Sequence, residues 1–540
     1  MDASYPSVDE NEWKFHEIAP FLNHTGVTSA MVASESYESE SVIPAEKLQD
    51  LKIRNIFMIT LESTTSQVFP IQNNTHLLKE VYKHRRPHQA YAEPLDATPF
   101  AKQLFGDDSD GTHANGIVIE GAETSSSYTL KSMLASHCGV SPLAVDFLEE
   151  VTGTIYQPCL AHILKEWSLP SISSQKSMTN HSQTLDFRGK RCRDDWCGAS
   201  WGTHFVQSTI AGYDRQQAMM KMMGFDTGEV LSKETLMLTT AKYPIPDGTI
   251  NSGEWSFPET FIMPYIRDLI RKSRVSGDRL FLSHLTSTTH YPFRSPKSWN
   301  KRKYTDHSEL NNYLNTIAWS DSWVKQLFDV LEKEGIADET LVIISGDHGM
   351  AIEDGDLSQT LPYANPHVNN FRIPMMFHHP KLTETRIVAN WTNVSILPTI
   401  LDLLQETSSL NPEQKKSAKV LLREYEGQSL LRQPKYRFPN GNKKYNFGVA
   451  NPGGTHLAVS SPDPDVPWRM TLPLCQSGTL TFANIVEDQD EKEVVRLLTP
   501  TLLIESIQNK WGDKAATWAQ EALSAADKWM KDTSKRWKLS

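Results

Sequence analysis

The sequence of 540 residues lacks the hallmarks of several large classes of protein. Acidic residues outnumber basic ones by 65 to 54, which gives a formal net charge of -11. This balance provides no basic surface for a nucleic-acid backbone, so we expect no nucleic-acid partner. No run of about 18 apolar residues occurs, and the start of the chain shows no basic region followed by an apolar stretch. We therefore expect a chain that is soluble as given, without a transmembrane segment or a visible signal peptide.

Cysteine is scarce as well. The five cysteines are Cys138, Cys159, Cys192, Cys197 and Cys475. They lack the paired short spacings of a structural zinc site, so we predict none. Cys192 and Cys197 are close enough for a small disulfide loop in an oxidising compartment, although their spacing fits two free thiols as well.

What remains is an ordinary globular composition, with 39% hydrophobic and 22% charged residues. The length exceeds the usual size of one hydrophobic core, so we expect a large domain with a smaller appended unit. The hydrophobic pattern divides the chain into an irregular arm over residues 1–50, a large domain over 51–440, a small β subdomain over 441–500 and a terminal helix over 501–540.

Short apolar runs alternate with helical patterns through the large domain. The runs Ile53–Leu61, Arg279–Leu285 and Leu341–Ser345 are typical of buried strands, and helices are predicted near 130–138, 156–167, 265–274 and 311–334. This alternation predicts an α/β fold with a mainly parallel central sheet and helices on both faces. Beyond 440, short strand-like pieces broken by Gly and Pro predict a small antiparallel subdomain.

Carboxylate and imidazole groups follow two of these predicted strands. Glu62 comes directly after the first, and Asp347 and His348 follow the third within the sequence SGDHG. Ligands collect outside the carboxyl ends of strands in open α/β sheets, so we expect these side chains to meet at one point. Such a set of oxygen and nitrogen ligands binds a divalent cation. Taken singly, Asp347 fits a helix cap as well as a metal site, and a solvated turn residue is the simpler interpretation of Glu62.

A cluster of hydroxyls stands where another helix is expected to begin. The segment TSSSYTLKS spans residues 124–132. The free amides at the start of a helix favour a bound anion, and a hydroxyl beside a divalent cation becomes a nucleophile. The simpler interpretation is a helix cap with spare serines.

Several segments, in their order along the chain, resemble the alkaline-phosphatase/sulfatase superfamily. They are IRNIFMITLES, YTLKSMLASHCGVSP, THYPF, the long stretch from YLNTIAWSD to VIISGDHG, and NFRIPMMFHHP. Within the superfamily they are similar to sulfatase-domain proteins of the lipoteichoic-acid-synthase and phosphoglycerol-transferase type, including fungal relatives. The resemblance spans about residues 50 to 410 and implies an alkaline-phosphatase-like fold.

The resemblance implies a role for each matching residue. Glu62, Asp347 and His348 match the metal ligands of the family. Thr129 lies ten residues before Gly139, similar to the spacing from nucleophile to glycine in sulfatases and nucleotide phosphodiesterases. It is the first choice as nucleophile and as a further metal ligand. The nearer relatives place a Thr-Ser pair earlier in this loop, so Thr124 and Ser126 stay open as alternatives.

The resemblance also implies substrate contacts. His290, within THYPF, matches a histidine used at the leaving group, and Arg215 resembles a phosphate-binding arginine, although its spacing to Gly224 differs by one residue. Lys131 balances negative charge at the site or is an ordinary exposed helix residue. His284 and His367 are weaker candidates, for which a structural role is the simpler expectation.

One departure from the family bears on the reaction. Classical sulfatases carry Cys-x-Pro-Ser-Arg for conversion to formylglycine, whereas Thr129–Met133 reads TLKSM, and Cys138 does not begin such a motif. Direct attack by a hydroxyl on a phosphate ester, above all a phosphodiester, is therefore expected. The alternatives are a sulfuric-ester hydrolase without formylglycine and an inactive protein that binds a glycan or a lipid headgroup. The expected cofactor is one divalent ion, Mn before Mg, Ca or Zn, and the resemblance suggests the extracellular face of a cell.

Overall fold

The computed structural model describes residues 39–106, 113–168, 199–238, 242, 243, 245, 255–351, 365–474 and 478–537. The central sheet has eight strands in the order β4-β3-β5-β1-β6-β7-β2-β8. Strand β7 runs antiparallel to both neighbours, and the other neighbouring pairs are parallel. The mainly parallel sheet expected from the sequence is thus confirmed. Its strands are β1 (Asn55–Leu61), β2 (Gly116–Glu120), β3 (Trp201–Gln207), β4 (Val230–Leu231), β5 (Arg279–Leu285), β6 (Thr340–Gly346), β7 (Met375–His378) and β8 (Thr385–Val388).

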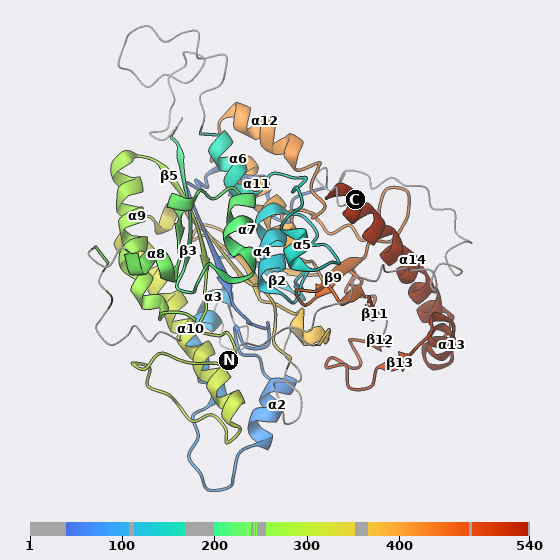
Figure 1. Cartoon of the computed structure of the whole chain (residues 1–540). Coiled ribbons are helices and arrows are strands. Elements are labelled where there is room, and N and C mark those ends of the chain that lie inside the picture. Colours follow the sequence, from blue (N-terminus) through green and yellow to red (C-terminus); the bar gives the residue numbers. More distant parts are fainter. Residues whose placement is uncertain are drawn as a thin grey trace.

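Successive side chains of β1 enter two different hydrophobic cores. Ile56 and Met58 belong to one core, whereas Phe57, Ile59 and Leu61 belong to the other. The alternation follows from the two-residue period of a strand, and burial on both faces explains why β1 is apolar throughout. Helices cover both faces (Figure 1): α4 (Thr129–Cys138), α6 (Leu160–Glu166), α7 (Gln216–Met222) and α11 (Ile396–Glu406) on the first core, and α3 (Pro99–Phe105), α9 (Met263–Ser276) and α10 (Ser308–Lys333) on the second.

A second sheet of five antiparallel strands follows, in the order β13-β12-β11-β10-β9. This confirms the predicted antiparallel unit. Its strands are β9 (Asn446–Ala450), β10 (His456–Ser460), β11 (Trp468–Pro473), β12 (Leu480–Asn484) and β13 (Val495–Leu497). The sheet and the terminal helices share one core and lie at one side of the molecule, away from α9 and α10 (Figure 1).

The terminal helical stretch differs from the prediction. It consists of two helices, α13 (Pro500–Trp511) and α14 (Asp513–Arg536), which meet at Gly512. Gly512 has a φ of 79°, a backbone conformation that glycine adopts without a steric penalty and that ends the first helix. The expectation of a single helix was wrong because residues that favour helix stand on both sides of this glycine and mask the break.

Shorter helices complete the described chain. Residues 1–38 of the predicted arm lie outside the described residues, and its end forms α1, whose Leu48 is buried. In the part of the chain that the structure describes, no helix has both the length and the apolar character needed to cross a bilayer. The remaining helices are α1 (Ala45–Gln49), α2 (His76–Lys83), α5 (Phe147–Glu150), α8 (Lys233–Leu238) and α12 (Pro412–Leu421).

Candidate active site

The register of two neighbouring strands brings the predicted metal ligands together. Leu61 of β1 pairs with Gly346 of β6, so Glu62 and Asp347 leave the sheet side by side. The backbone N–H of Asp347 continues the ladder by donating to Leu61 O at 3.1 Å. One ligand atom from each of Glu62, Asp347 and His348 lies within 4.8 Å of the other two. We call these three residues the acidic cluster.

The turn after β6 is tightly constrained. A Cβ atom on Gly349 would lie 2.0 Å from the carbonyl oxygen of Asn369, and one on Gly346 would lie 2.6 Å from that of Thr64. Both positions therefore require glycine. Within the turn, Asp347 Oδ1 accepts hydrogen bonds from the backbone N–H groups of Ser63 at 2.8 Å and His348 at 2.7 Å. These bonds fix the orientation of the carboxylate.

The donor atoms of the acidic cluster fit a cation. Asp347 Oδ2 is buried and accepts no hydrogen bond from the described residues. His348 Nδ1 lies 2.9 Å from Gly349 O, which can only accept, so Nδ1 carries a proton. In the neutral imidazole, the form that binds a metal, Nε2 then presents a lone pair. Nε2 lies 3.4 Å from Asp347 Oδ2 and 3.6 Å from Glu62 Oε1. Electron pairs from three side chains thus converge on one buried point.

Electrostatics at Glu62 also favour a cation. Burial raises the pKa of Glu62, and the negative charge of Asp347 raises this pKa further. Both effects disfavour the ionised carboxylate in the metal-free protein. A divalent cation would reverse them, because it would be the largest charge in the site.

Thr129 is the hydroxyl that the fold brings to this cluster. It is the first residue of α4, and its Oγ1 lies 3.3 Å from Glu62 Oε2 and 3.5 Å from His348 Nε2. The alternatives face elsewhere: Thr124 Oγ1 donates to Ser126 O at 2.9 Å, and Ser126 Oγ accepts from the backbone N–H of Tyr128 at 3.2 Å. Of the three candidate hydroxyls, that of Thr129 is the one in contact with the acidic cluster.

Asn393 is a contributor to the site that the sequence did not reveal. Its Oδ1 accepts from the backbone N–H of Ser125 at 2.9 Å, and its Nδ2 donates to Ser132 Oγ at 2.8 Å. Ser132 Oγ in turn donates to Asp347 O at 2.5 Å. Asn393 thus links the loop before Thr129 to the turn that carries Asp347 and His348. This link is visible only in the folded structure, because Asn393 is far from both segments in sequence.

The expectation that Lys131 serves the site was wrong. The side chain is fully buried, and its Nζ donates to Glu150 Oε2 at 2.5 Å and to Leu143 O at 2.7 Å. Lys131 follows Thr129 by two residues, which is about 200° around a helix axis, so the two side chains leave α4 in opposite directions. Neither the charge-balancing role nor an exposed position is observed.

A substitution tests the structural role of Lys131. Lys131→Met leaves the buried carboxylate of Glu150 without its cation, so we expect the free energy of unfolding to fall by about 3–5 kcal/mol. Denaturant unfolding measures the loss, and the double variant Lys131→Met/Glu150→Leu should recover part of it. A stable Lys131→Met variant with weakened substrate affinity would return Lys131 to the site.

Among the described residues, the structure shows no hydrogen bond or ion pair from His290 or Arg215 to the acidic cluster, and Arg215 Nη1 donates to Leu148 O at 3.5 Å. Both are exposed. The residue before His290, Thr289, donates to Glu62 O at 2.5 Å, and the residue before Arg215, Asp214, accepts from the hydroxyl of Tyr128 at 2.5 Å. His290 Nδ1 lies 2.6 Å from Tyr291 O, which leaves Nε2 for another partner. Their substrate roles stay predictions.

The weaker histidine candidates have structural contacts. His284 accepts a hydrogen bond from Trp323 Nε1 at 2.9 Å through its Nε2, and its Nδ1 lies 2.9 Å from Val206 O. His367 Nε2 lies 2.7 Å from Asp490 O. These contacts agree with the simpler of the two expectations.

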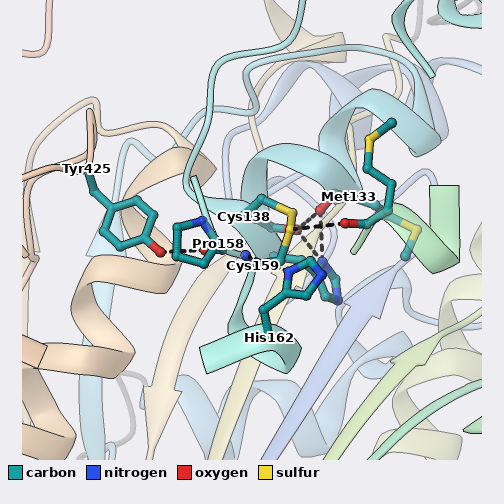
Figure 2. The surroundings of a disulfide bond; sticks show 9 residues. Met133, Cys138, Pro158, Cys159, His162 and Tyr425 are labelled. Atoms are coloured by element: carbon teal, nitrogen blue, oxygen red, sulfur yellow. Dashed lines mark hydrogen bonds between the residues drawn. A yellow bond between two sulfur atoms is a disulfide. The ribbon is translucent and has the colours of Figure 1, made fainter. Parts of the chain in front are cut away.

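A disulfide anchors the far end of α4. Cys138, the last residue of α4, is bonded to Cys159, which caps the start of α6 (Figure 2). Next to it, the hydroxyl of Tyr425 donates to Pro158 O at 2.5 Å. The pairing considered from the sequence, between Cys192 and Cys197, lies outside the described residues. The two ends of α4 are thus held by different means, the site at Thr129 and the disulfide at Cys138.

Known proteins resemble this chain in sequence and in fold. Residues 199–406 match the family model described as Sulfatase. A protein in the alkaline phosphatase superfamily from Vibrio parahaemolyticus is similar with a TM-score of 0.56 at 14% identity, over 98% of each chain. The fold is that of the alkaline-phosphatase/sulfatase superfamily. The lipoteichoic acid synthase LtaP from Listeria monocytogenes is also similar, with a TM-score of 0.52 at 12% identity, over 94% of this chain and 97% of that one.

Curated relatives match over a shorter stretch. The lipoteichoic acid synthase-like protein YvgJ of Bacillus subtilis (strain 168) is 24% identical over 153 residues, which is 26% of this chain and 24% of that protein. Lipoteichoic acid synthase 1 of the same organism is 26% identical over 149 residues, 26% of this chain and 23% of that protein. The chain therefore matches about a quarter of the length of these relatives. The chain resembles ester-acting enzymes of this superfamily.

Proposed function

We propose that the protein is a metal-dependent hydrolase or transferase of phosphate esters, with phosphodiesters as its preferred substrates. The observation that carries this proposal is the position of Thr129 Oγ1, 3.3 Å from Glu62 Oε2 and 3.5 Å from His348 Nε2. A hydroxyl at a helix start beside a buried set of metal ligands is the arrangement that phosphoryl transfer through a covalent intermediate requires.

Glu62, Asp347 and His348 would hold one divalent ion, and Thr129 would complete the set. Mn²⁺ is the first choice, with Mg²⁺, Ca²⁺ and Zn²⁺ as alternatives, because carboxylate and imidazole ligands suit all of them to some degree. When bound, the ion supplies positive charge that lowers the pKa of a neighbouring hydroxyl and neutralises phosphate oxygens.

Three side chains of the protein have distinct roles in the proposed reaction. Thr129 releases its hydroxyl proton to solvent and Oγ1 attacks phosphorus. The bond from phosphorus to the ester oxygen of the departing alcohol breaks, and a phospho-threonine forms that keeps the second ester group of a phosphodiester. His290 Nε2 gives a proton or a hydrogen bond to the departing oxygen, and Arg215 orients non-bridging oxygens. Water on the phospho-threonine completes hydrolysis and regenerates the hydroxyl, whereas an acceptor alcohol completes a transfer.

The alcohol portion of the substrate follows from the resemblance alone. Similar proteins are named as lipoteichoic acid synthases, so a lipid headgroup or a glycan is the alcohol we propose. The extracellular face of a cell is the compartment we propose, and the Cys138–Cys159 disulfide supports it because such bonds persist in oxidising surroundings. We also keep the domain boundaries near residues 50, 440 and 500 as a proposal.

The test is a comparison of two ester substrates on the purified protein. We expect hydrolysis of bis-nitrophenyl phosphate that is lost after chelation and returns with Mn²⁺, and little hydrolysis of nitrophenyl sulfate. A preference for the sulfate ester would instead assign a sulfuric-ester hydrolase without formylglycine, an outcome that the matched Sulfatase family leaves open. A protein that binds no metal and hydrolyses neither ester would be a glycan- or headgroup-binding protein.

A further inference from the structure

The loop after β5, residues 286–290, holds the backbone of Glu62 from both sides. Thr286 Oγ1 accepts the hydrogen bond of the Glu62 N–H at 3.0 Å, and Thr289 Oγ1 donates to Glu62 O at 2.5 Å. The N–H of Thr286 also donates to Thr60 O at 3.0 Å, next to the end of β1. The position of the Glu62 carboxylate therefore depends on the position of this loop.

One buried side chain, Glu259, fixes the loop in turn. It begins a 3₁₀ helix (Glu259–Ile262) and is 1% exposed. Its Oε1 accepts from the backbone N–H groups of Ser287 and Thr288, each at 2.9 Å. Its Oε2 accepts from Thr288 Oγ1 at 2.5 Å and from Trp319 Nε1 of α10 at 2.9 Å. The carboxylate thus ties the loop to a long helix of the central fold.

The chemistry of these contacts requires a carboxylate. Ser287 Oγ donates to Oε1 as well, at 3.3 Å. All five groups donate, and both oxygens of a carboxylate accept. A primary amide has one accepting oxygen, and its NH₂ group would face either the backbone donors or the donors from Thr288 and Trp319. A buried carboxylate is kept only where such partners compensate for its lost hydration. Glu259 contacts the loop that holds Glu62 and does not itself contact the acidic cluster. None of the roles assigned above includes it.

We propose that Glu259 is a positioning residue for the metal centre, acting through the 286–290 loop on Glu62 and on His290 at the end of the loop. The inference rests on the proposed function, because that function makes Glu62 a metal ligand. Residues that orient metal ligands commonly change metal affinity by about 10–100-fold when they are replaced.

The variant Glu259→Gln tests the proposal in the full chain. We expect faster amide hydrogen exchange in the peptide spanning 286–290, because the N–H groups of Ser287 and Thr288 lose a good acceptor. By calorimetry we expect Mn²⁺ to bind at least about tenfold more weakly than to the wild type. Thr289→Val, which removes the bond to Glu62 O, should weaken Mn²⁺ binding similarly, and Thr289→Ser should restore it.

Asp402→Asn is the matched control. Asp402 is an equally buried carboxylate, which accepts from Ser429 Oγ at 2.6 Å and Arg432 Nε at 2.7 Å, so the same change from acid to amide perturbs a core away from the loop. It should lower the melting temperature without changing Mn²⁺ affinity. The double variant Glu259→Gln/Thr289→Val should lose less Mn²⁺ affinity than the two single losses combined, since both act through one loop.

Each other outcome has a definite meaning. Unchanged exchange in the 286–290 loop, or a loosened loop with unchanged Mn²⁺ affinity, would overturn the role of Glu259. An equal loss of affinity in Asp402→Asn would also overturn it, because the effect would then be general destabilisation. A wild-type protein that binds none of Mn²⁺, Mg²⁺, Ca²⁺ and Zn²⁺ while its loop loosens in Glu259→Gln would instead refute the proposed metal centre, and the role of Glu259 with it.

Discussion

Replacing Thr129 by alanine is expected to lower kcat/KM for bis-nitrophenyl phosphate by about 10³-fold or more, because the reaction loses its nucleophile. Mn²⁺ should still bind, since Glu62, Asp347 and His348 remain within 4.8 Å of one another. Steady-state kinetics and calorimetry on the same preparation measure both quantities. A loss of activity with retained metal separates a missing nucleophile from a damaged metal site.

Two further variants sharpen this test. Thr129→Ser keeps a hydroxyl at the start of α4 and should keep measurable activity, whereas Ser126→Ala should stay close to the wild type because Ser126 Oγ is occupied by the N–H of Tyr128. Mass spectrometry of a rapidly quenched wild-type reaction should find a nitrophenyl phosphate group on the peptide that contains Thr129, because one of the two nitrophenols has left. Full activity of Thr129→Ala, or this group on Thr124 or Ser126, would show that the nucleophile is wrong.

The sequence predicted that Glu62, Asp347 and His348 lie together, because strand ends carry positional information. Glu62 and Asp347 each follow an apolar run, and the carboxyl ends of parallel strands meet at one edge of a sheet. The pairing of Leu61 with Gly346 confirms that the two runs are neighbours. Local pattern was therefore enough to place these ligands together, although it did not show how the second carboxylate oxygen of Asp347 is left for a cation.

The contacts that the sequence missed are long-range and polar. Glu259 and Asn393 have ordinary neighbours along the chain, and their importance arises from partners such as Trp319 and Ser132 that are far away in sequence. Lys131 was assigned to the site because the loop otherwise lacks a cation, yet helical rotation turns its side chain away from Thr129 and toward Glu150. The disulfide was missed because nothing in the spacing of Cys138 to Cys159 indicates that the start of α6 packs against the end of α4.

Replacing Glu62 by glutamine should weaken metal binding without lowering the stability of the metal-free protein. Burial and the charge of Asp347 raise the pKa of Glu62, so the metal-free protein contains a carboxylate whose ionisation is unfavourable. A neutral glutamine of the same shape removes this cost, and its oxygen can still accept from Ser63 Oγ, which lies 2.8 Å from Glu62 Oε1. The melting temperature of the metal-free variant should therefore equal or exceed that of the metal-free wild type.

The stability that Mn²⁺ adds should, in contrast, fall in the Glu62→Gln variant. With Mn²⁺ at about 100 times its dissociation constant, the wild type should gain about 2.7 kcal/mol of stability. Glu62→Gln lacks one of the three clustered ligands and should lose nearly all of this gain.

The matched control is Glu123→Gln. Glu123 is also a buried carboxylate with a raised pKa, but it accepts a hydrogen bond from Ser460 Oγ at 2.7 Å and does not belong to the acidic cluster. Differential scanning calorimetry with and without Mn²⁺ measures both effects. A metal ligand destabilises the folded protein without its ion and is indispensable once the ion is bound. A metal-free Glu62→Gln variant that melts well below the metal-free wild type, and that still gains stability with Mn²⁺, would therefore show that Glu62 is a structural carboxylate.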